Sequence, residues 1–428
     1  MTQQAMVAAK AKSIFDEPVE ERMKVYRKRY CKVLDRLKNK SVITVGFQVI
    51  HRAVWKYNRL YQLMEQDPFF EPVVFVCPYL REGSEYMLEE MNVTFEEIQS
   101  KGYKAIKTYD EENDRWIDIK SSLNPDIVFY SVPFDYTRDE YRLHHYTESL
   151  SCYVPYFFTT NGKEEKNYDG PFHNLVWRNF YETEVHKQYA QMYARNGGDN
   201  VVVSGYPPLD DFLYPSDNDD SDPWPLKDHK RIIWAPHHTI EGQGQDLDYS
   251  TFKQYYEVFQ DIALEYSDRI QIAFKPHPML KEKLYKDEEW GKERTNAYYD
   301  FWKKLENGLL EQSGYTRLFL TSDALIHDCS SFMVEYLSTS KPPLYLLRDE
   351  NVSGRLHEFG KKAFEQHYHA HRSSEIIQFI DDQILNKQDV MQAQRHQFVA
   401  EYLKDNDGFT ASENIIKYIK SAIRAGGK

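Results

Sequence analysis

The residues best suited to chemistry in this sequence gather at four places where an apolar run ends. The most informative place is 322–337, where a buried strand is predicted to turn directly into a helix at Ser330 and Ser331. A helix start offers unpaired backbone N–H groups and the positive end of the helix dipole, and serine hydroxyls add donors. This pattern predicts a phosphate-binding site, although serines also cap helices that bind no ligand.

A histidine is held between two prolines after another predicted strand. The segment is Lys275-Pro276-His277-Pro278, directly after the apolar run that ends at Phe274. The prolines restrict the backbone and therefore present His277 rigidly. An imidazole can donate a hydrogen bond to phosphate or transfer a proton near neutral pH. We therefore expect a catalytic or phosphate-binding role for His277, with a structural turn histidine as the alternative.

Adjacent histidines stand at a third strand end. His237 and His238 follow the apolar run that ends in Ala235-Pro236, and Thr239 and the glycine-containing loop 241–245 come next. Such a loop can bend around a ligand. Adjacent side chains on an extended segment point to opposite faces, and no third ligand is close in sequence, so we predict no metal here. We expect His237, His238 and Thr239 to contribute to phosphate binding.

Two turns with glycine end strands in the first half of the sequence. Asn161, Gly162 and Lys163 follow one predicted strand, and Ser204-Gly205-Tyr206-Pro207 follows another. In open parallel sheets, ligands bind beyond the carboxyl ends of the strands. These turns are therefore the fourth place to search for a site.

The elements that must position these residues alternate between strands and helices. Short runs rich in β-branched and aromatic residues recur, each followed by a helical pattern, which predicts parallel sheets in an α/β fold. Strands are predicted at 42–45, 73–77, 126–130, 153–158 and 201–204, and again at 231–234, 270–274, 324–326 and 343–347. The intervening helices include 251–266 and 331–338.

The 428 residues are too many for one ordinary core, so we expect two domains. A polar, proline-rich segment without period, 215–230, predicts the linker between an N-terminal domain, 41–214, and a C-terminal domain, 231–410. A last helix within 411–428 carries a stripe of isoleucines that must be buried. The sequence leaves open whether this helix packs back across the domain boundary.

A basic amphipathic helix is predicted within the N-terminal segment 1–40. Its apolar residues recur at helical spacing over 21–40, and its other face holds Arg22, Lys24, Arg27, Lys28, Arg29, Lys32, Arg36 and Lys38. Such a face can rest on anionic lipid headgroups, or it can simply be solvated. Peripheral contact with a membrane through 21–40 is therefore a hypothesis.

Composition excludes several classes of protein. The formal net charge of −13 argues against a nucleic-acid binder, which would need clustered Lys and Arg. The four cysteines are scattered, as free thiols in a reducing compartment would be. No stretch has the roughly 20 apolar residues of a membrane span or the pattern of a signal peptide. We expect a cytoplasmic protein, which the basic helix could place at the inner face of the cytoplasmic membrane.

The motifs also follow one another in a particular order. The series runs Asn161-Gly162, Gly205-Tyr206-Pro207 with Asp210, Ala235-Pro236, Lys275-Pro276-His277-Pro278, Asp328-Cys329-Ser330-Ser331 with Glu335, and Lys341-Pro342. This series resembles the CDP-glycerol glycerophosphotransferase family, which builds teichoic-acid and capsule-type polymers. The resemblance is strongest in the Lys-Pro-His-Pro and Asp-x-Ser-Ser elements.

The resemblance implies a GT-B arrangement, in which two Rossmann-like domains face a central cleft and the C-terminal domain holds the nucleotide donor. It implies that His277 contacts the donor phosphates or assists the leaving group, and that Ser330 and Ser331 hold the pyrophosphate. The other residues expected on the donor side are Lys275, Asp328 and Glu335, together with the histidine pair and Thr239. No cofactor is implied, because the nucleotide-linked donor is itself a substrate, and the acceptor would be a polysaccharide or a lipid-linked molecule.

One departure concerns the acceptor. The family usually has His-Gly, whose histidine activates the acceptor, where this chain has Asn161-Gly162, and asparagine cannot take a proton at neutral pH. Asn161 stays a candidate catalytic residue by position, His51 is the further candidate base, and Gly46, Gly162 and Lys163 are expected on the acceptor side. Other histidines that could serve as the base are His144, His145 and His173.

Three function classes remain open. The first is transfer of glycerophosphate or another polyol phosphate from a CDP-linked donor to a growing bacterial surface polysaccharide. The second is a GT-B glycosyltransferase of capsule or lipopolysaccharide synthesis that uses a nucleotide sugar. The third is a catalytically silent subunit that binds nucleotide or glycan, which the asparagine at position 161 suggests. A nucleotide-sugar epimerase on the same scaffold ranks last.

Overall fold

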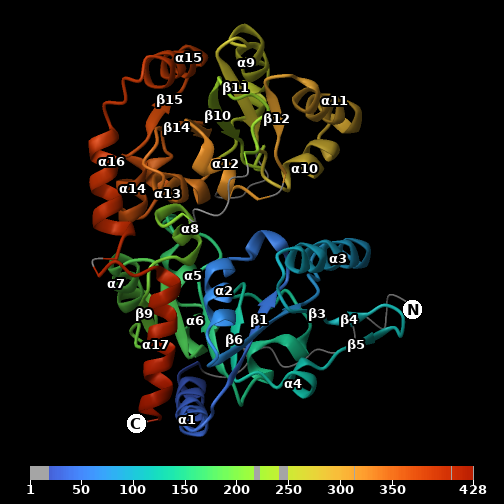
Figure 1. Cartoon of the computed structure of the whole chain (residues 1–428), viewed down its shortest axis with the longest axis vertical. Coiled ribbons are helices and arrows are strands. Elements are labelled where there is room, and N and C mark those ends of the chain that lie inside the picture. Colours follow the sequence, from blue (N-terminus) through green and yellow to red (C-terminus); the bar gives the residue numbers. More distant parts are fainter. Residues whose placement is uncertain (1–18, 216–221, 241–248, 313, 406, 428) are drawn as a thin grey trace. The chain divides into compact units, whose positions relative to one another are not determined.

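The computed structural model describes residues 19–215, 222–240, 249–312, 314–405 and 407–427, and it divides into two compact units (Figure 1). Unit 1 comprises residues up to 158, then 163–210 and the segment from 405 onward. Unit 2 comprises 159–162 and 211–404. The glycine-containing loop 241–245 lies outside the described residues.

Unit 1 is built on a seven-stranded sheet with the order β3-β2-β1-β6-β7-β8-β9, and all its strand pairs are parallel. Most of its strand residues are buried, as expected for a parallel sheet covered by helices on both faces. The strands are β1 (Ile43–Val49), β2 (Phe70–Val76), β3 (Ala105–Lys107), β6 (Ile127–Tyr130), β7 (Leu150–Tyr153), β8 (Arg178–Tyr181) and β9 (Val201–Val203), and a separate antiparallel ribbon pairs β4 (Tyr109–Asp110) with β5 (Arg115–Trp116).

The helices of unit 1 come from both ends of the chain. They are α1 (Val19–Leu37), α2 (Asn58–Gln66), α3 (Ser84–Ser100), α4 (Ile119–Ser122), α5 (Glu164–Tyr168), α6 (Pro171–Leu175), α7 (Glu184–Tyr193) and α17 (Ala411–Ala425). The last helix packs on α1 and α2 and buries Ile415, Ile419 and Ile423 (Figure 1). The carboxylate of Asp210 accepts the N–H groups of Ala411 at 2.8 Å and of Ser412 at 2.9 Å, which fixes the start of α17 on unit 1.

Unit 2 is built on a six-stranded parallel sheet with the order β12-β11-β10-β13-β14-β15. Its core surrounds Trp234, which stacks on Phe259 with ring centroids 4.1 Å apart. The strands are β10 (Lys230–Ala235), β11 (Ile270–Phe274), β12 (Gly308–Leu310), β13 (Ala324–His327), β14 (Pro343–Leu346) and β15 (Tyr368–Ala370). The helices are α8 (Asp210–Leu213), which enters the unit, and α9 (Phe252–Glu265), α10 (Leu280–Lys286), α11 (Gly291–Lys304), α12 (Thr316–Thr321), α13 (Ser331–Leu337), α14 (Glu358–Phe364), α15 (Ser373–Phe379) and α16 (Gln392–Phe398).

The α/β class with parallel sheets is as predicted, and the differences lie in particular segments. The strand expected at 153–158 instead occupies Leu150–Tyr153, since Pro155 cannot donate to a ladder beyond it. The sequence did not predict four short strands, because three or four residues are too few to show a clear hydrophobic period. These strands are β3, β8, β12 and β15.

The boundaries of the two units also differ from the expected domain ranges. Residues 222–229, expected within the linker, pack on unit 2: the Trp224 indole donates to the Thr321 hydroxyl at 2.9 Å, and the Leu226 N–H donates to Gln271 at 3.0 Å. Residues 159–162 group with unit 2, and residues from 405 onward group with unit 1. The polar, proline-rich composition of 222–229 therefore reflects an irregular surface segment.

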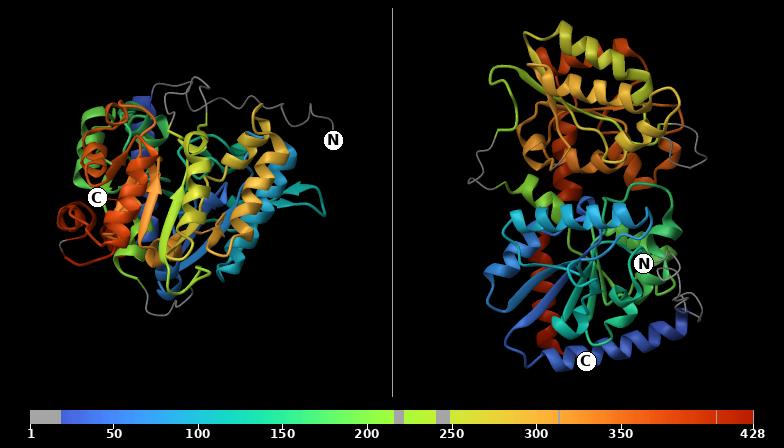
Figure 2. Two further views of the ribbon diagram at one scale, coloured as in Figure 1. Left: turned by 90° about the horizontal axis from the view of Figure 1, so that it is seen from above. Right: turned by 90° about the vertical axis from the view of Figure 1, so that its right-hand side faces the viewer.

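Helix α1 runs across one end of unit 1 (Figure 2). It buries Tyr26, Val33 and Leu37, while Lys28 and Lys32 are exposed. Part of its basic face is neutralised, because Arg36 pairs with Asp126 at 3.0 Å. Among the described residues, no helix combines the length and the apolar composition that crossing a bilayer requires.

Candidate functional site

The site residues of unit 2 gather at the carboxyl edge of its sheet. Strand β10 lies between β11 and β13, and all three run in the same direction. The segments that follow these strands, 236–239, 275–278 and 328–330, therefore leave the sheet side by side. The sheet order, rather than closeness in sequence, brings the three motifs together.

Backbone hydrogen bonds hold the first two segments to each other. The N–H of Lys275 donates to the carbonyl of Trp234 at 2.8 Å, and the N–H of His277 donates to the carbonyl of Pro236 at 3.0 Å. The ring nitrogen Nδ1 of His277 accepts the N–H of Met279 at 3.1 Å. Together these contacts fix both the backbone and the ring of His277.

Asp328 lies beneath the site and organises it. Its side chain has no exposed surface, and its carboxylate accepts the N–H of His237 at 2.7 Å and the N–H and hydroxyl of Thr251 at 2.6 and 2.9 Å. Burial raises the pKa of Asp328 to about 6, against the effect of these hydrogen bonds. Asp328 was expected on the donor side. In the structure its carboxylate accepts hydrogen bonds from His237 and Thr251, so Asp328 positions the turn that carries His237.

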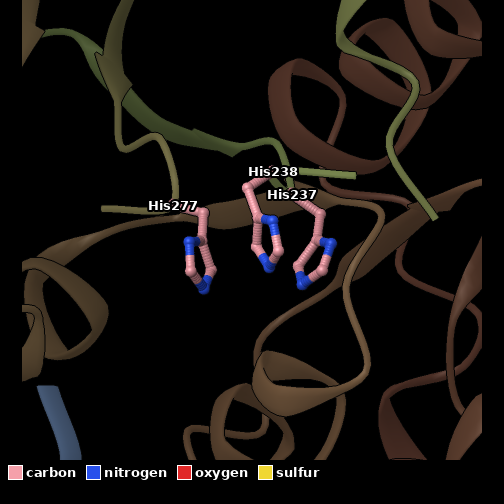
Figure 3. Close-up of side chains that lie close together, drawn as sticks. All are labelled: His237, His238 and His277. Atoms are coloured by element: carbon pink, nitrogen blue, oxygen red, sulfur yellow. The ribbon is translucent and has the colours of Figure 1, made fainter. Parts of the chain in front are cut away.

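Three histidine rings lie together at this edge and point the same way (Figure 3). The ring centroids are 4.3 Å apart for His237 and His238, 4.2 Å for His238 and His277, and 5.1 Å for His237 and His277. The side chains of the adjacent pair do not point to opposite faces, because the chain bends at His238 and does not continue as a strand (Figure 3). The three rings offer nitrogen atoms within 4.8 Å of one another, which is metal-ligand spacing.

The electrostatic surroundings of these rings favour an anion. Burial lowers the pKa of all three histidines, to about 4 for His238, and the charge of Lys283 lowers each of them further. Burial also lowers the pKa of Lys275 to about 8, with Glu311 acting in the opposite direction. The imidazoles are therefore neutral at neutral pH, while Lys283 and Lys275 supply positive charge.

The start of α13 adjoins the histidines through Tyr249. Tyr249 lies edge-on to His237, with centroids 5.6 Å apart, and its pKa is raised by burial but held down by the nearby Ser330 hydroxyl. Ser330 is the N-cap residue of α13 and is half-buried, whereas the side chain of Ser331 lies outside the described set. Glu335 is only 1% exposed and accepts the hydroxyl of Tyr315, so it faces the interior of unit 2.

The acceptor-side candidates are divided between the units. Asn161 forms an isolated antiparallel bridge with Leu356, and Gly162 donates its N–H to the carbonyl of Arg355 at 2.9 Å, within unit 2. Lys163 belongs to unit 1 and is the N-cap residue of α5. Gly46 lies in the interior of β1, where a Cβ atom would sit 2.8 Å from the Phe75 ring, so close packing explains this glycine.

The candidate bases of unit 1 have different surroundings. Nδ1 of His51 accepts the N–H of Ala53 at 3.1 Å, its Nε2 lies 3.0 Å from the Tyr86 hydroxyl, and the Glu90 carboxylate is 3.4 Å away. His173 is buried, which lowers its pKa to about 4 and removes it from solvent.

The other two candidate bases share a partner. His144 and His145 both place Nε2 on the carboxylate of Asp139, at 3.2 and 2.8 Å. This group also has metal-ligand spacing, but the Arg142 guanidinium lies 3.5 Å from the same carboxylate and disfavours a cation.

Some residues near the site escaped the sequence analysis. Tyr249 and Thr251 lie just before α9, and a threonine in that place is a capping signal. Their role at the site becomes visible only in the structure, where β10 lies next to β13. A cavity of about 230 Å³ opens beyond the carboxyl ends of β14 and β15 and is lined by Leu347, Glu350, Val352, Ser353, Phe364 and His371. Its residues form no motif in the sequence.

Comparison with known proteins links this geometry to one family. The model of the CDP-Glycerol:Poly(glycerophosphate) glycerophosphotransferase family matches residues 159–421, more than half of the chain. Among curated proteins, none matches the chain.

Solved structures show the same fold at low identity. The wall teichoic acid polymerase TagF soaked with CDPG has a TM-score of 0.58 and 14% identity, covering 95% of each chain. The S. aureus MnaA–UDP co-structure has a TM-score of 0.55 and 16% identity, covering 89% of this chain and 96% of the other. The UDP-GlcNAc 2-epimerase from Neisseria meningitidis bound to UDP-GlcNAc has a TM-score of 0.52 and 14% identity, covering 88% and 99%. The two Rossmann-like units thus form a GT-B-like α/β fold.

Proposed function

Because the chain belongs to the CDP-glycerol:poly(glycerophosphate) glycerophosphotransferase family, and is therefore a transferase of cell wall polymer synthesis, we propose that it moves a glycerophosphate or related polyol-phosphate unit from a CDP-linked donor to a growing surface polymer. The observation that carries the proposal is the convergence of His237, His277 and Lys275 at the carboxyl edge of unit 2. This is where parallel sheets bind nucleotides.

The reaction consists of one displacement at phosphorus. The acceptor hydroxyl attacks the phosphorus that bears the polyol, the bond from that phosphorus to the bridging oxygen breaks, and CMP leaves with the bonding electrons. The proton of the hydroxyl goes to a base. Such a transfer needs little covalent chemistry, so positioning and stabilisation of the leaving charge carry the catalysis. His277, Lys275 and Lys283 supply the donors and positive charge for that task.

The acceptor-activating base must differ from the family histidine, because asparagine stands at position 161. The histidines of unit 1, among them His51, stay the candidates for this base. Beside His51, the Glu90 carboxylate lies 3.4 Å from Nδ1 and raises the pKa of the ring against the lowering effect of burial.

The cavity beyond β14 and β15 is the place that we propose for the base of the donor. It lies on the same edge of the sheet as Ser330, since β14 is the neighbour of β13. We propose that the donor base occupies this cavity.

Binding and turnover of CDP compounds test the proposal. We expect CDP to raise the melting temperature of the protein more than equal concentrations of UDP or GDP do, because only a nucleotide that binds the native state stabilises it. We also expect release of CMP from CDP-glycerol when a polyol-phosphate acceptor is supplied, measured by chromatography. Stabilisation by UDP alone, with turnover of UDP-sugars, would instead establish a glycosyltransferase.

The basic face of α1 leads to a second prediction. We propose that the enzyme works at the inner face of the cytoplasmic membrane and that Lys28 and Lys32 contact anionic lipid. Each basic residue near such a surface contributes about 1 kcal/mol, so the double reversal K28E/K32E is expected to weaken binding at least about tenfold.

Co-sedimentation with phosphatidylglycerol-containing vesicles measures this affinity. The matched control is K303E/K304E on α11, where both side chains are exposed, which changes the net charge equally in the other unit. Equal vesicle binding by the two double variants would show that α1 makes no contact with the membrane.

A further inference from the structure

The inner ring nitrogen of His237 has a hydrogen bond whose direction can be deduced. Nδ1 of His237 lies 3.0 Å from the hydroxyl oxygen of Thr239. That oxygen already accepts two backbone N–H groups, from Tyr249 at 2.9 Å and from Ser250 at 3.2 Å. A hydroxyl has two acceptor positions and one proton. The hydroxyl of Thr239 must therefore donate its hydrogen bond to His237, and Nδ1 of His237 is the acceptor.

Nδ1 of His277 is also an acceptor, but its donor is a backbone N–H group. Its Nδ1 accepts the backbone N–H of Met279 at 3.1 Å. A neutral imidazole carries one proton, and a ring whose Nδ1 accepts carries that proton on Nε2. Burial and the neighbouring charges lower the pKa of His237 and His277, which keeps both rings neutral. Both histidines therefore present an N–H group at the ring tip.

The three rings lie close together, with nitrogen atoms within 4.8 Å of one another. All three rings leave their strands in the same direction, and His238 lies between the other two (Figure 3). Lys283 acts electrostatically on all three rings, and Lys275 acts on His277. N–H donors on the same side of the site, beside ammonium groups, match a ligand that has several acceptor oxygens and negative charge.

A metal ion is the other ligand that three histidines at this spacing suggest. A metal-bound histidine has a bare lone pair toward the metal, and its other nitrogen donates a proton to a carbonyl or carboxylate. In His237 and His277 the inner nitrogen accepts a hydrogen bond instead. The tip N–H then stands where the lone pair would be needed, so the hydrogen bonds select an anion over a cation.

We propose that His237 and His277 form an uncharged receptor for the oxygens of a diphosphate, and that Thr239 is the positioning residue that fixes the tautomer of His237. Thr239 is itself held by the two backbone N–H groups of the segment that leads into α9. That the diphosphate belongs to the nucleotide donor rests on the proposed function, whereas the tautomers rest on the contacts alone.

The tautomers are measured directly on the wild-type chain by ¹⁵N NMR of labelled histidines at pH 7.5. Signals are assigned by their loss in H237Q and H277Q. We expect both residues to show a protonated Nε2 and a bare Nδ1. A protonated Nδ1 on either ring, or two charged rings, would overturn the proposal without the use of any activity measurement.

The role of Thr239 is tested with T239V and T239S. Serine keeps the hydroxyl, so T239S is expected to bind inorganic pyrophosphate within about twofold of wild type, by calorimetry. Valine removes it, so T239V is expected to bind about tenfold more weakly, the loss of about one hydrogen bond, and to show a mixture of His237 tautomers. Equal pyrophosphate affinity in both variants contradicts the proposal, and the wild-type tautomers decide the question if T239V does not fold.

Two further outcomes separate this receptor from the proposed function. Stoichiometric binding of Zn²⁺ that H237Q and H277Q abolish would replace the receptor by a metal site. Pyrophosphate binding with the expected variant pattern, but without turnover of any CDP-alditol, would keep the receptor and reject the donor. Turnover of CDP-glycerol that T239V leaves unchanged would keep the donor and reject the receptor.

Discussion

Replacing His277 by asparagine is expected to lower kcat/KM for the nucleotide donor about 100- to 1,000-fold while the fold is retained. In H277N the amide oxygen of the new side chain would reach the position of Nδ1 and continue to accept the N–H of Met279, so the turn after β11 stays capped. What disappears is the N–H at the ring tip, which we expect to bind charge that develops on the leaving nucleotide. Initial-rate kinetics of CMP release measure the effect.

Glutamine at the same position is the matched control. Its amide nitrogen reaches the place of Nε2 and can donate there, so H277Q should recover part of the activity that H277N loses. Melting curves of both variants verify that they fold. Equal and nearly full activity of H277N and H277Q would show that His277 serves the turn and not the reaction.

Replacing Asp328 by alanine is expected to destabilise the protein by about 3 kcal/mol and to weaken donor binding together with it. The change leaves the N–H groups of His237 and Thr251 without their acceptor in a fully buried place. The turn that carries His237 then loses its connection to β13. Denaturant unfolding and CDP titration, carried out on the same preparation, measure both effects.

The pH dependence of this deficit has a definite sign. The folded-state pKa of Asp328, about 6, lies above the ordinary value of 3.8, so the native state binds a proton that the unfolded chain does not bind until lower pH. The stability contributed by wild-type Asp328 therefore rises as pH falls through about 6. The stability gap between wild type and D328A should be larger at about pH 5 than at about pH 7, and a gap that shrinks would contradict the assigned burial of the carboxylate.

The sequence predicted the strands that carry the site because they are long apolar runs with clear ends. Ile270–Phe274 matches its predicted range, and the turns at Lys275 and Ser330 follow their strands as expected. The family followed from the order of the motifs, and the matched family model confirms it. Local pattern is sufficient for these inferences because each one depends on neighbours within a few residues.

The site itself depends on contacts between distant residues, which no local pattern records. The carboxylate of Asp328 accepts hydrogen bonds from residues 91 and 77 positions earlier, so one residue of the motif that predicted phosphate binding also holds the turn of His237. The clustering of His237, His238 and His277 follows from β11 lying next to β10, and the tautomer of His237 depends on the backbone of Tyr249 and Ser250. The expectation that the adjacent histidines diverge was wrong for a related reason, because it assumed an extended chain after Pro236.

The return of α17 to unit 1 has a consequence for biosynthesis. The ribosome delivers the chain from its amino end, and domains generally begin to fold as they emerge. The surface of α1 and α2 that receives Ile415, Ile419 and Ile423 stays uncovered until the whole of unit 2 has been translated. Unit 2 is therefore synthesised completely before unit 1, which precedes it in the chain, can close its own hydrophobic core.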